Sequence, residues 1–180
     1  MLTIDNTALL VIDVQGKLAQ LMHQQESLFA NLDKIIKGAQ ALELPLIWTE
    51  QVPEKLGRTT PEIAELLVNS AQPISKTSFS CCGVAPFMAQ LAPLQRQQIL
   101  VTGIETHICV YQTSVDLLKQ GYEVQVVADA VSSRTAENKQ IGLARIQAAG
   151  GVITSTEMAL FELLRVAEGE QFRQIARIVK

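Results

Sequence analysis

The 180-residue sequence is poor in aromatic residues, histidine and cysteine. Aromatic side chains make up 4% of the chain, and there are two histidines and three cysteines. A low aromatic share in a chain that is 48% hydrophobic favours an aliphatic α/β interior over a β-sandwich. An odd number of cysteines, two of them adjacent at Cys81 and Cys82, makes a poor disulfide framework and is typical of a reducing, cytoplasmic location.

The charges and the apolar runs exclude several classes of partner. The net charge is −3, and lysine and arginine are scattered, which argues against nucleic acid and anionic membranes. No segment reaches the roughly 20 apolar residues that span a bilayer. The beginning of the chain, MLTIDNTALLVIDVQ, lacks the basic region of a signal peptide and runs into a predicted strand. We therefore expect a cytoplasmic protein that acts on a small molecule.

Six short apolar runs recur along the chain, and most are followed by a helical pattern. Such alternation predicts a parallel sheet with helices on both faces, joined by right-handed crossovers. We therefore predict one domain over residues 1–180, with a three-layer α/β/α fold and a six-stranded parallel sheet. The expected strands are 7–14, 44–50, 72–80, 97–104, 122–130 and 151–156, and the expected helices are 25–44, 61–67, 84–94, 107–120, 135–149 and a segment starting at 157.

Reactive side chains fall at or near the carboxyl ends of four of these strands. Asp13 ends the first strand, Glu50 the second, Lys76 lies in the third, and Cys109 follows the fourth. Ligands of open α/β sheets bind outside the carboxyl ends of the strands. An acid, an amine and a thiol are thus expected to meet at one edge of the sheet.

Each of these residues also has a purely structural interpretation. Asp13 is equally suited to capping the turn that follows its strand. An isolated lysine such as Lys76 is most often a solvated side chain on an edge strand. A free cysteine such as Cys109 is most often a small buried hydrophobic residue. The conjunction of the three therefore indicates chemistry more strongly than any one of them.

The position of Cys109 at the beginning of a helix suits a nucleophile. Backbone N–H groups there, and a nearby Lys76 ammonium, would lower the pKa of the thiol. His107 lies two residues earlier and points to a different helix face, whereas His23 lies in a polar stretch and stays open as a base. Asp13 is the better candidate base because its strand ends where the pocket is expected.

Metal and nucleotide motifs are missing. The sequence has no HxxxH, CxxC or DxH pattern, and adjacent cysteines are poorly arranged to chelate one metal ion. The segment after the first strand, DVQGKLAQ, has neither the GxGxxG pattern nor a phosphate-binding lysine loop. We predict no metal site and no cofactor.

Three segments closely resemble the isochorismatase-like cysteine hydrolases, a family on a six-stranded parallel sheet that includes nicotinamidases, N-carbamoylsarcosine amidases and isochorismatases. These segments are LLVIDVQ, ISKTSFS and VTGIETHICVYQTSVDLLKQGYEVQVVADA, and the resemblance spans about residues 8–160. It also implies a homo-oligomer.

The resemblance assigns roles to five residues. It implies that Asp13, Lys76 and Cys109 form a catalytic triad. It also implies a cis peptide bond between Ile104 and Glu105, which would turn the Glu105 N–H toward the Cys109 N–H to form an oxyanion hole. The expected chemistry is hydrolysis of a small amide or related C–N bond through a thioester intermediate.

The sequence departs from two branches of this family. The segment WTEQVPEKLGRTTPEI lacks the metal-binding Asp-x-His of the nicotinamidases. Siderophore-pathway isochorismatases replace the nucleophilic cysteine, whereas this chain keeps Cys109. The chain instead looks like the small isochorismatase-domain hydrolases, whose substrates are largely undefined. Two alternatives stay open, a catalytically idle binding or scaffold protein and a redox sensor built on Cys81 and Cys82.

Five further residues are candidates for a substrate pocket by their position alone. They lie close to the expected strand ends and are Gln15, Trp48, Glu50, Gln51 and Phe79. The two aromatic side chains have a structural alternative, because an aromatic residue at a strand end is more often part of the core.

Overall fold

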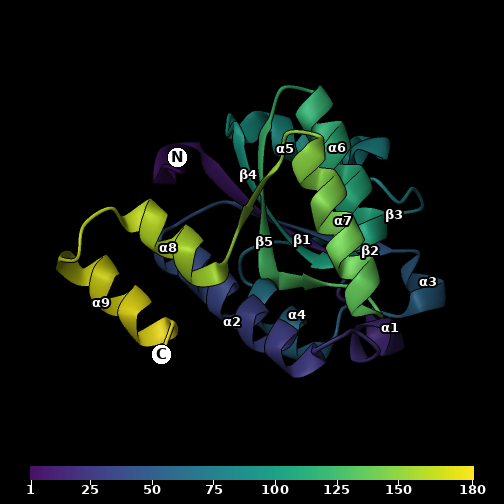
Figure 1. Ribbon diagram of the computed structural model, residues 1–180, viewed down its shortest axis with the longest axis horizontal. Coiled ribbons are helices and arrows are strands. Elements are labelled where there is room, and N and C mark those ends of the chain that lie inside the picture. Colours follow the sequence, from purple (N-terminus) through teal and green to yellow (C-terminus); the bar gives the residue numbers. More distant parts are fainter.

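The architecture follows from the order of six parallel strands. The structure, a computed structural model, describes residues 1–180 and places the strands in the order β3-β2-β1-β4-β5-β6. Helices cover both faces of the sheet (Figure 1). The predicted α/β fold with a six-stranded parallel sheet is confirmed.

The elements agree with the sequence pattern except at some boundaries and for two short helices, over residues 16–20 and 53–56, that the pattern did not predict. The strands are β1 (Thr7–Ile12), β2 (Leu46–Gln51), β3 (Pro73–Lys76), β4 (Gln98–Ile104), β5 (Glu123–Ser132) and β6 (Val152–Thr154). The helices are α1 (Gly16–Gln20), α2 (Gln25–Ala41), α3 (Pro53–Leu56), α4 (Pro61–Leu67), α5 (Ala85–Leu91), α6 (Tyr111–Lys119), α7 (Ala136–Ala148), α8 (Thr156–Leu164) and α9 (Gly169–Ile178).

Two of the differences have a clear local cause. Helix α2 ends at Ala41 instead of residue 44, because Glu43 has a left-handed φ of 56° and Leu44 precedes a proline, where helical backbone is disfavoured. Helix α5 ends at Leu91 because Pro93 lacks the N–H that the next turn needs, and a short 3-10 turn follows.

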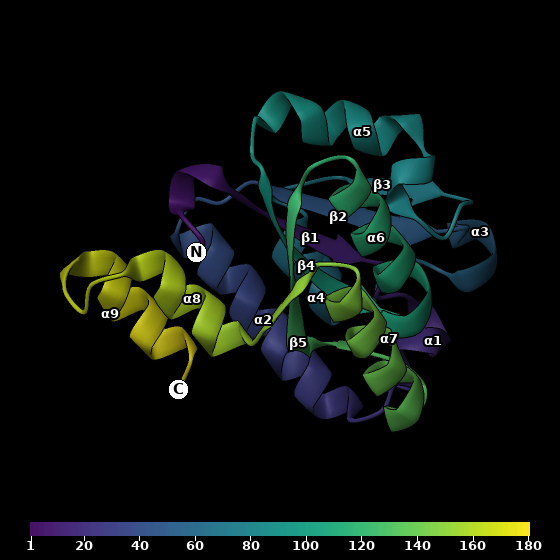
Figure 2. The ribbon, with the colours of Figure 1, turned by 45° about the horizontal axis from the view of Figure 1, so that its top comes forward.

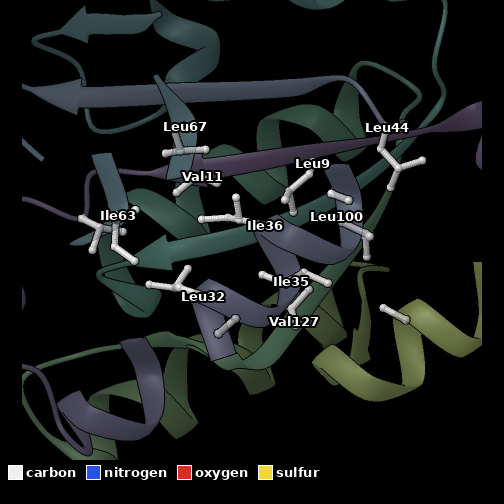
Figure 3. Close-up of a cluster of buried hydrophobic side chains, with 14 of the residues drawn as sticks. Leu9, Val11, Leu32, Ile35, Ile36, Leu44, Ile63, Leu67, Leu100 and Val127 are labelled. Carbon is white, nitrogen blue, oxygen red and sulfur yellow. The ribbon is translucent and has the colours of Figure 1, made fainter. Parts of the chain in front are cut away.

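The sheet separates two hydrophobic cores, and β1 contributes to both. Leu9 and Val11 point to one face, where α2, α4, α8 and α9 pack, and part of this cluster is drawn in Figure 3. Leu10 and Ile12 point to the other face, against α5, α6 and α7. Because both faces are covered, all six residues of β1 are buried, which accounts for its continuous apolar sequence.

The C-terminal helix packs on its own chain. Figures 1 and 2 show α8 and α9 beside α2, at one end of the molecule. Ile175 of α9 is fully buried, and the rings of Phe161 and Phe172 lie 6.5 Å apart. One face of this segment is therefore used within the monomer, and the homo-oligomer stays a prediction. No helix has both the length and the apolar character to cross a membrane.

The centre of the sheet contains its topological switch point. From β1 the chain passes to β2 and β3 on one side and then returns to β4 on the other side of β1. Gly103, in β4, lies so close to β1 that an added Cβ would be 2.0 Å from the Ile12 carbonyl oxygen. Its φ of +105° also favours glycine. The ends of β1 and β4 are therefore held tightly together where a ligand crevice is expected.

Candidate active site

Asp13 follows the last residue of β1 and is fixed by the neighbouring strand β2. Its side chain is buried, its N–H donates to the Thr49 carbonyl at 3.1 Å, and Thr49 Oγ1 donates to Oδ1 at 2.8 Å. Its φ of 52° lies in the left-handed region, which aspartate tolerates better than most residues. The Thr49 hydroxyl thus occupies one carboxylate oxygen and leaves Oδ2 facing the centre of the site.

Lys76, the last residue of β3, supplies the charge that faces Asp13. Its Nζ lies 2.6 Å from Asp13 Oδ2, and the side chain is fully buried. The ammonium group also donates to Gln51 Oε1 at 2.6 Å, Phe79 O at 3.1 Å and Ser78 O at 3.2 Å. Burial, the largest effect, would lower the pKa of Lys76, but Asp13 and, more weakly, Cys81 and Cys109 together outweigh it, and the pKa is raised. Lys76 is therefore a permanent cation, and Asp13 Oδ2 has no hydrogen-bond partner apart from this ion pair.

Cys109 lies in a π-helical turn, Thr106–Val110, that leads directly into α6. Its side chain is 7% exposed. Burial first, and then the negative charge of the nearby Asp13 carboxylate, raise the pKa of the thiol to about 12. The Lys76 charge lowers this pKa, but by less. The prediction of a lowered thiol pKa is therefore wrong, because desolvation exceeds the effects of the helix and the lysine, and the resting group is a neutral thiol.

The triad predicted from the sequence thus forms one buried cluster in the structure. Asp13, Lys76 and Cys109 come from three different strand ends, and the first and last flank the switch point between β1 and β4. The sequence pattern brings them to one edge of the sheet. In the structure the Asp13 carboxylate is paired with the Lys76 ammonium through Oδ2 and lies near the Cys109 thiol, with which it lines one cavity.

The backbone beside Cys109 carries a free donor. The peptide bond between Ile104 and Glu105 is cis. The Glu105 N–H makes no hydrogen bond within the protein, while its carbonyl accepts from the N–H groups of Ile108 at 3.0 Å and Val110 at 3.2 Å. The Glu105 carboxylate accepts from Arg134 Nε at 3.0 Å and is thereby tied to the loop after β5.

The cavity above the thiol is small. It has a volume of about 80 Å³, and six of its ten lining residues are hydrophobic. Cys109 and Asp13 line it together with the candidate residues Gln15, Gln51 and Phe79. Phe79 is 53% exposed and lies at the entrance. The sequence pattern alone did not identify the other hydrophobic side chains of the wall, which are Leu18, Leu56, Ile104 and Ile108.

Trp48 and Glu50 do not line this cavity. Both are buried and hold the loop after α3 instead. Trp48 Nε1 donates to Thr59 Oγ1 at 2.8 Å, and Glu50 accepts from the Thr59 N–H at 2.7 Å and from Arg58 Nη1 at 2.9 Å. Alternation explains the placement of Glu50, since consecutive side chains of a strand point to opposite faces and its neighbour Gln51 points to the site.

Two residues near the triad, Thr49 and Cys81, were not identified as site residues from the sequence. Thr49 pairs in register with Ile12, the residue before Asp13. A polar residue near the end of an apolar strand is the one sequence feature that could have identified Thr49 as a site residue. Cys81 is fully buried, and its Sγ lies 3.8 Å from Thr49 Oγ1. Burial raises its pKa to about 12. No sequence signal places Cys81 here, because the loop after β3 folds back toward the sheet.

Neither histidine contacts the triad. His107 Nδ1 lies 2.9 Å from Ser133 Oγ. The His23 N–H donates to the Ser133 carbonyl, and the His23 carbonyl accepts from the Ser132 hydroxyl. His23 lines a separate cavity between α2, β5 and α7. Asp13 is therefore the base within reach of Cys109. Histidine, cysteine, aspartate and glutamate form no cluster of three or more that could share a metal ion.

Comparison with known proteins gives a family. The Isochorismatase domain matches residues 7–158. The chain is 36% identical over 179 residues to the secreted isochorismatase effector Isc1 of Phytophthora sojae (strain P6497), covering 97% of this chain and 85% of that protein. It is 35% identical over 177 residues to isochorismatase domain-containing protein 2B of Mus musculus, covering 98% and 82%.

Solved structures separate the branches of this fold. The MAR1 ribonuclease of Caenorhabditis elegans superposes with a TM-score of 0.93 and 32% identity, covering 99% of this chain and 91% of that one. The nicotinamidase PncA of Bacillus subtilis gives a TM-score of 0.75 and 14% identity, covering 83% and 99%, a likeness of fold alone. The chain therefore belongs to the isochorismatase-domain family and is similar to its domain-containing-protein-2 and MAR1-like members rather than to the nicotinamidases.

Proposed function

We propose that this protein hydrolyses a small amide or related C–N bond, with Cys109 as nucleophile, Asp13 as base and Lys76 as the fixed cation. Membership of a family with hydrolase members supports the reaction class. The observation that carries the proposal is Asp13 Oδ2, a buried carboxylate oxygen that is paired only with Lys76 and whose charge acts on the nearby Cys109 thiol.

The first half of the reaction forms a thioester. The Cys109 sulfur attacks the substrate carbonyl carbon while the thiol proton passes to Asp13, so that the attacking group is a thiolate only during bond formation. The Glu105 N–H, and the Cys109 N–H beside it, donate to the oxygen that becomes negative. The C–N bond then breaks, and the leaving nitrogen takes the proton from Asp13.

The second half releases the acid. A water molecule attacks the thioester carbon and gives a proton to the Asp13 carboxylate. The C–S bond breaks, and the departing sulfur regains that proton as a thiol. Lys76 keeps its proton throughout, because the raised pKa leaves it charged, and it stays paired with Asp13 Oδ2.

A hydrolysis screen tests the proposal. Ammonia release from a panel of small primary amides is compared between the wild type and Cys109→Ala, with Cys82→Ala as a matched control on a half-buried thiol outside the triad. We expect activity that Cys109→Ala abolishes and Cys82→Ala retains. Activity that survives loss of Cys109 would refute the assigned nucleophile.

The structure does not favour two other activities. The nematode relative is named a ribonuclease, but no cation lines the cavity, and the neighbouring Lys76 and Arg134 are paired with Asp13 and Glu105, so the cavity offers a polyanion no unpaired counter-charge. A binding protein without catalysis would not need a thiol, a carboxylate and an ammonium buried together, since burial of charge is costly. Failure of the amide screen together with tight binding of a protein partner would favour this second alternative.

A further inference from the structure

We propose that the site selects substrates whose acyl group is uncharged and apolar, and that Leu56 and Phe79 at the entrance set this selectivity. The inference rests on the proposed function and names the substrate class of the same site. Its starting point is that the cavity wall outside the reaction centre carries no unpaired charge, and that its two amide side chains are engaged at both nitrogen and oxygen.

The polar side chains of the wall bind each other. Gln15 Nε2 donates to Gln51 O at 3.1 Å and to Gly57 O at 2.6 Å, and its Oε1 accepts from the Gln51 N–H at 2.6 Å. Gln51 Oε1 accepts from Lys76 Nζ at 2.6 Å, and its Nε2 donates to Thr77 O at 2.8 Å. Both amides are thus engaged at the nitrogen and at the oxygen, and of their four N–H groups only one, on Gln51 Nε2, is uncommitted.

The charges near the cavity are paired in the same way. Lys76 and Asp13 neutralise each other, and the Glu105 carboxylate is bound by Arg134, which does not line the cavity. An anionic substituent would therefore meet Asp13 without a spare cation, and a cationic one would find both carboxylates of the wall, Asp13 and Glu105, already paired. A charge moved out of water without a partner is strongly disfavoured.

The entrance is apolar as well. Leu56 in α3 is 40% exposed and Phe79 in the loop after β3 is 53% exposed, and both line the cavity that contains Cys109. Single exposed hydrophobic residues are common on protein surfaces. Two that line the same cavity as the Cys109 thiol provide a contact for an aliphatic or aromatic acyl group and no counter-charge for a charged one.

Two alkylating agents that differ in charge test this selectivity. Iodoacetamide is neutral and iodoacetate is anionic, and in both reactions the sulfur–carbon bond forms as iodide leaves. Second-order rate constants at Cys109 are measured by peptide mass spectrometry and compared with the ratio for 2-mercaptoethanol. We expect a preference for iodoacetamide at least about tenfold above that reference. A Cys109 ratio equal to the reference would overturn the inference.

Substitutions locate the selectivity at the entrance. Leu56→Lys places a cation there and is expected to reduce the preference at least about fivefold. Leu21→Lys is the matched control, since Leu21 is 64% exposed and does not line the cavity. Phe79→Lys repeats the test independently if Leu56→Lys does not fold. An equal effect of the entrance and control substitutions would contradict the role of the entrance.

The same measurement separates this inference from the proposed function. If Cys109 is alkylated much faster than Cys82 but without charge preference, only the substrate class is wrong. If Cys109 reacts no faster than Cys82, the activated nucleophile itself is refuted.

Discussion

At the scale of single residues, the unexpected finding is the protonation state of the nucleophile. A thiol at the start of a helix and near a lysine was expected to ionise readily, yet burial and Asp13 raise its pKa to about 12. We therefore expect Asp13 to take the Cys109 proton only as the sulfur reacts, because the thiol is not ionised at rest. Thr49 determines which oxygen is available to accept the proton, because its hydroxyl donates to Asp13 Oδ1 and leaves Oδ2 for this role.

Replacement of Thr49 tests this selection. Thr49→Val keeps the shape but removes the donor to a buried carboxylate oxygen, which should lower the free energy of unfolding by about 1–3 kcal/mol. We also expect the rate of Cys109 acylation to fall about tenfold or more, because Asp13 is free to rotate away from the thiol. Thr49→Ser retains a hydroxyl and should restore the rate, and equal rates for the two variants would refute a positioning role.

At the scale of elements, the position of the proposed nucleophile Cys109 depends on the π-helical turn Thr106–Val110, which packs against α7 and follows β4. Helix α7 packs against the π-helical turn so closely that a Cβ added at Gly142 would lie 2.9 Å from the His107 backbone. Gly103 gives β4 a similarly close approach to β1. The position of Cys109 is therefore set by backbone contacts of glycine, which no pattern of reactive residues reveals.

Gly142→Ala tests the clamp from α7. Alanine normally favours a helix interior by about 1 kcal/mol over glycine, so a helix without this contact would gain stability. Here the methyl group meets backbone atoms and must push the turn away. We expect a lower melting temperature and slower alkylation of Cys109, and the exposed helical position Gln140→Ala serves as the control. A melting temperature raised by Gly142→Ala would contradict the clamp.

The sequence predicted the strands and the longer helices better than it predicted which side chains meet at the site. Buried strands such as β1 are recognisable because both faces are covered, and the order of strands and helices then indicates which residues reach the carboxyl edge of the sheet. Asp13, Lys76 and Cys109 were found in this way. Cys81 and Leu56 were not, because they reach the site through loop and short-helix geometry with no periodicity of its own.

At the scale of the whole molecule, the switch point of the sheet determines where chemistry occurs. Parallel strands direct their carboxyl ends to one edge, and there the chain leaves β1 and β4 toward opposite faces of the sheet. Lys76 is the last residue of β3, while Asp13 and Cys109 follow β1 and β4. The site therefore forms only when these strands are assembled in one sheet. Its buried thiols, Cys81 and Cys109, also make the stability of the whole protein depend on pH.

The buried thiols predict a loss of stability at alkaline pH. An unfolded cysteine ionises near its ordinary pKa of 9.0, while Cys81 and Cys109 ionise near about 12 in the folded chain. Their contribution is complete below about pH 9 and is lost as the pH rises toward 12, because the unfolded chain releases protons that the folded chain keeps. The free energy of unfolding should fall by up to about 1.4 kcal/mol per pH unit for each thiol.

Urea denaturation across this range measures the effect. Cys81→Ala removes one buried thiol outside the triad and should make the decline with pH shallower. Identical slopes for the variant and the wild type would show that Cys81 ionises alike in both states.

The pH dependence of Cys109 alkylation by iodoacetamide tests the central claim most directly. A pKa of about 12 leaves roughly one thiol in 100,000 ionised at pH 7, too few for rapid reaction by free thiolate. If Asp13 accepts the proton as the sulfur reacts, no proton is released to solvent, and the wild-type rate is constant between about pH 7 and 9. In Asp13→Asn the proton must leave to solvent, and the rate should rise about tenfold per pH unit. A wild-type rate that rises with pH in the same way would contradict the assignment of Asp13 as the base.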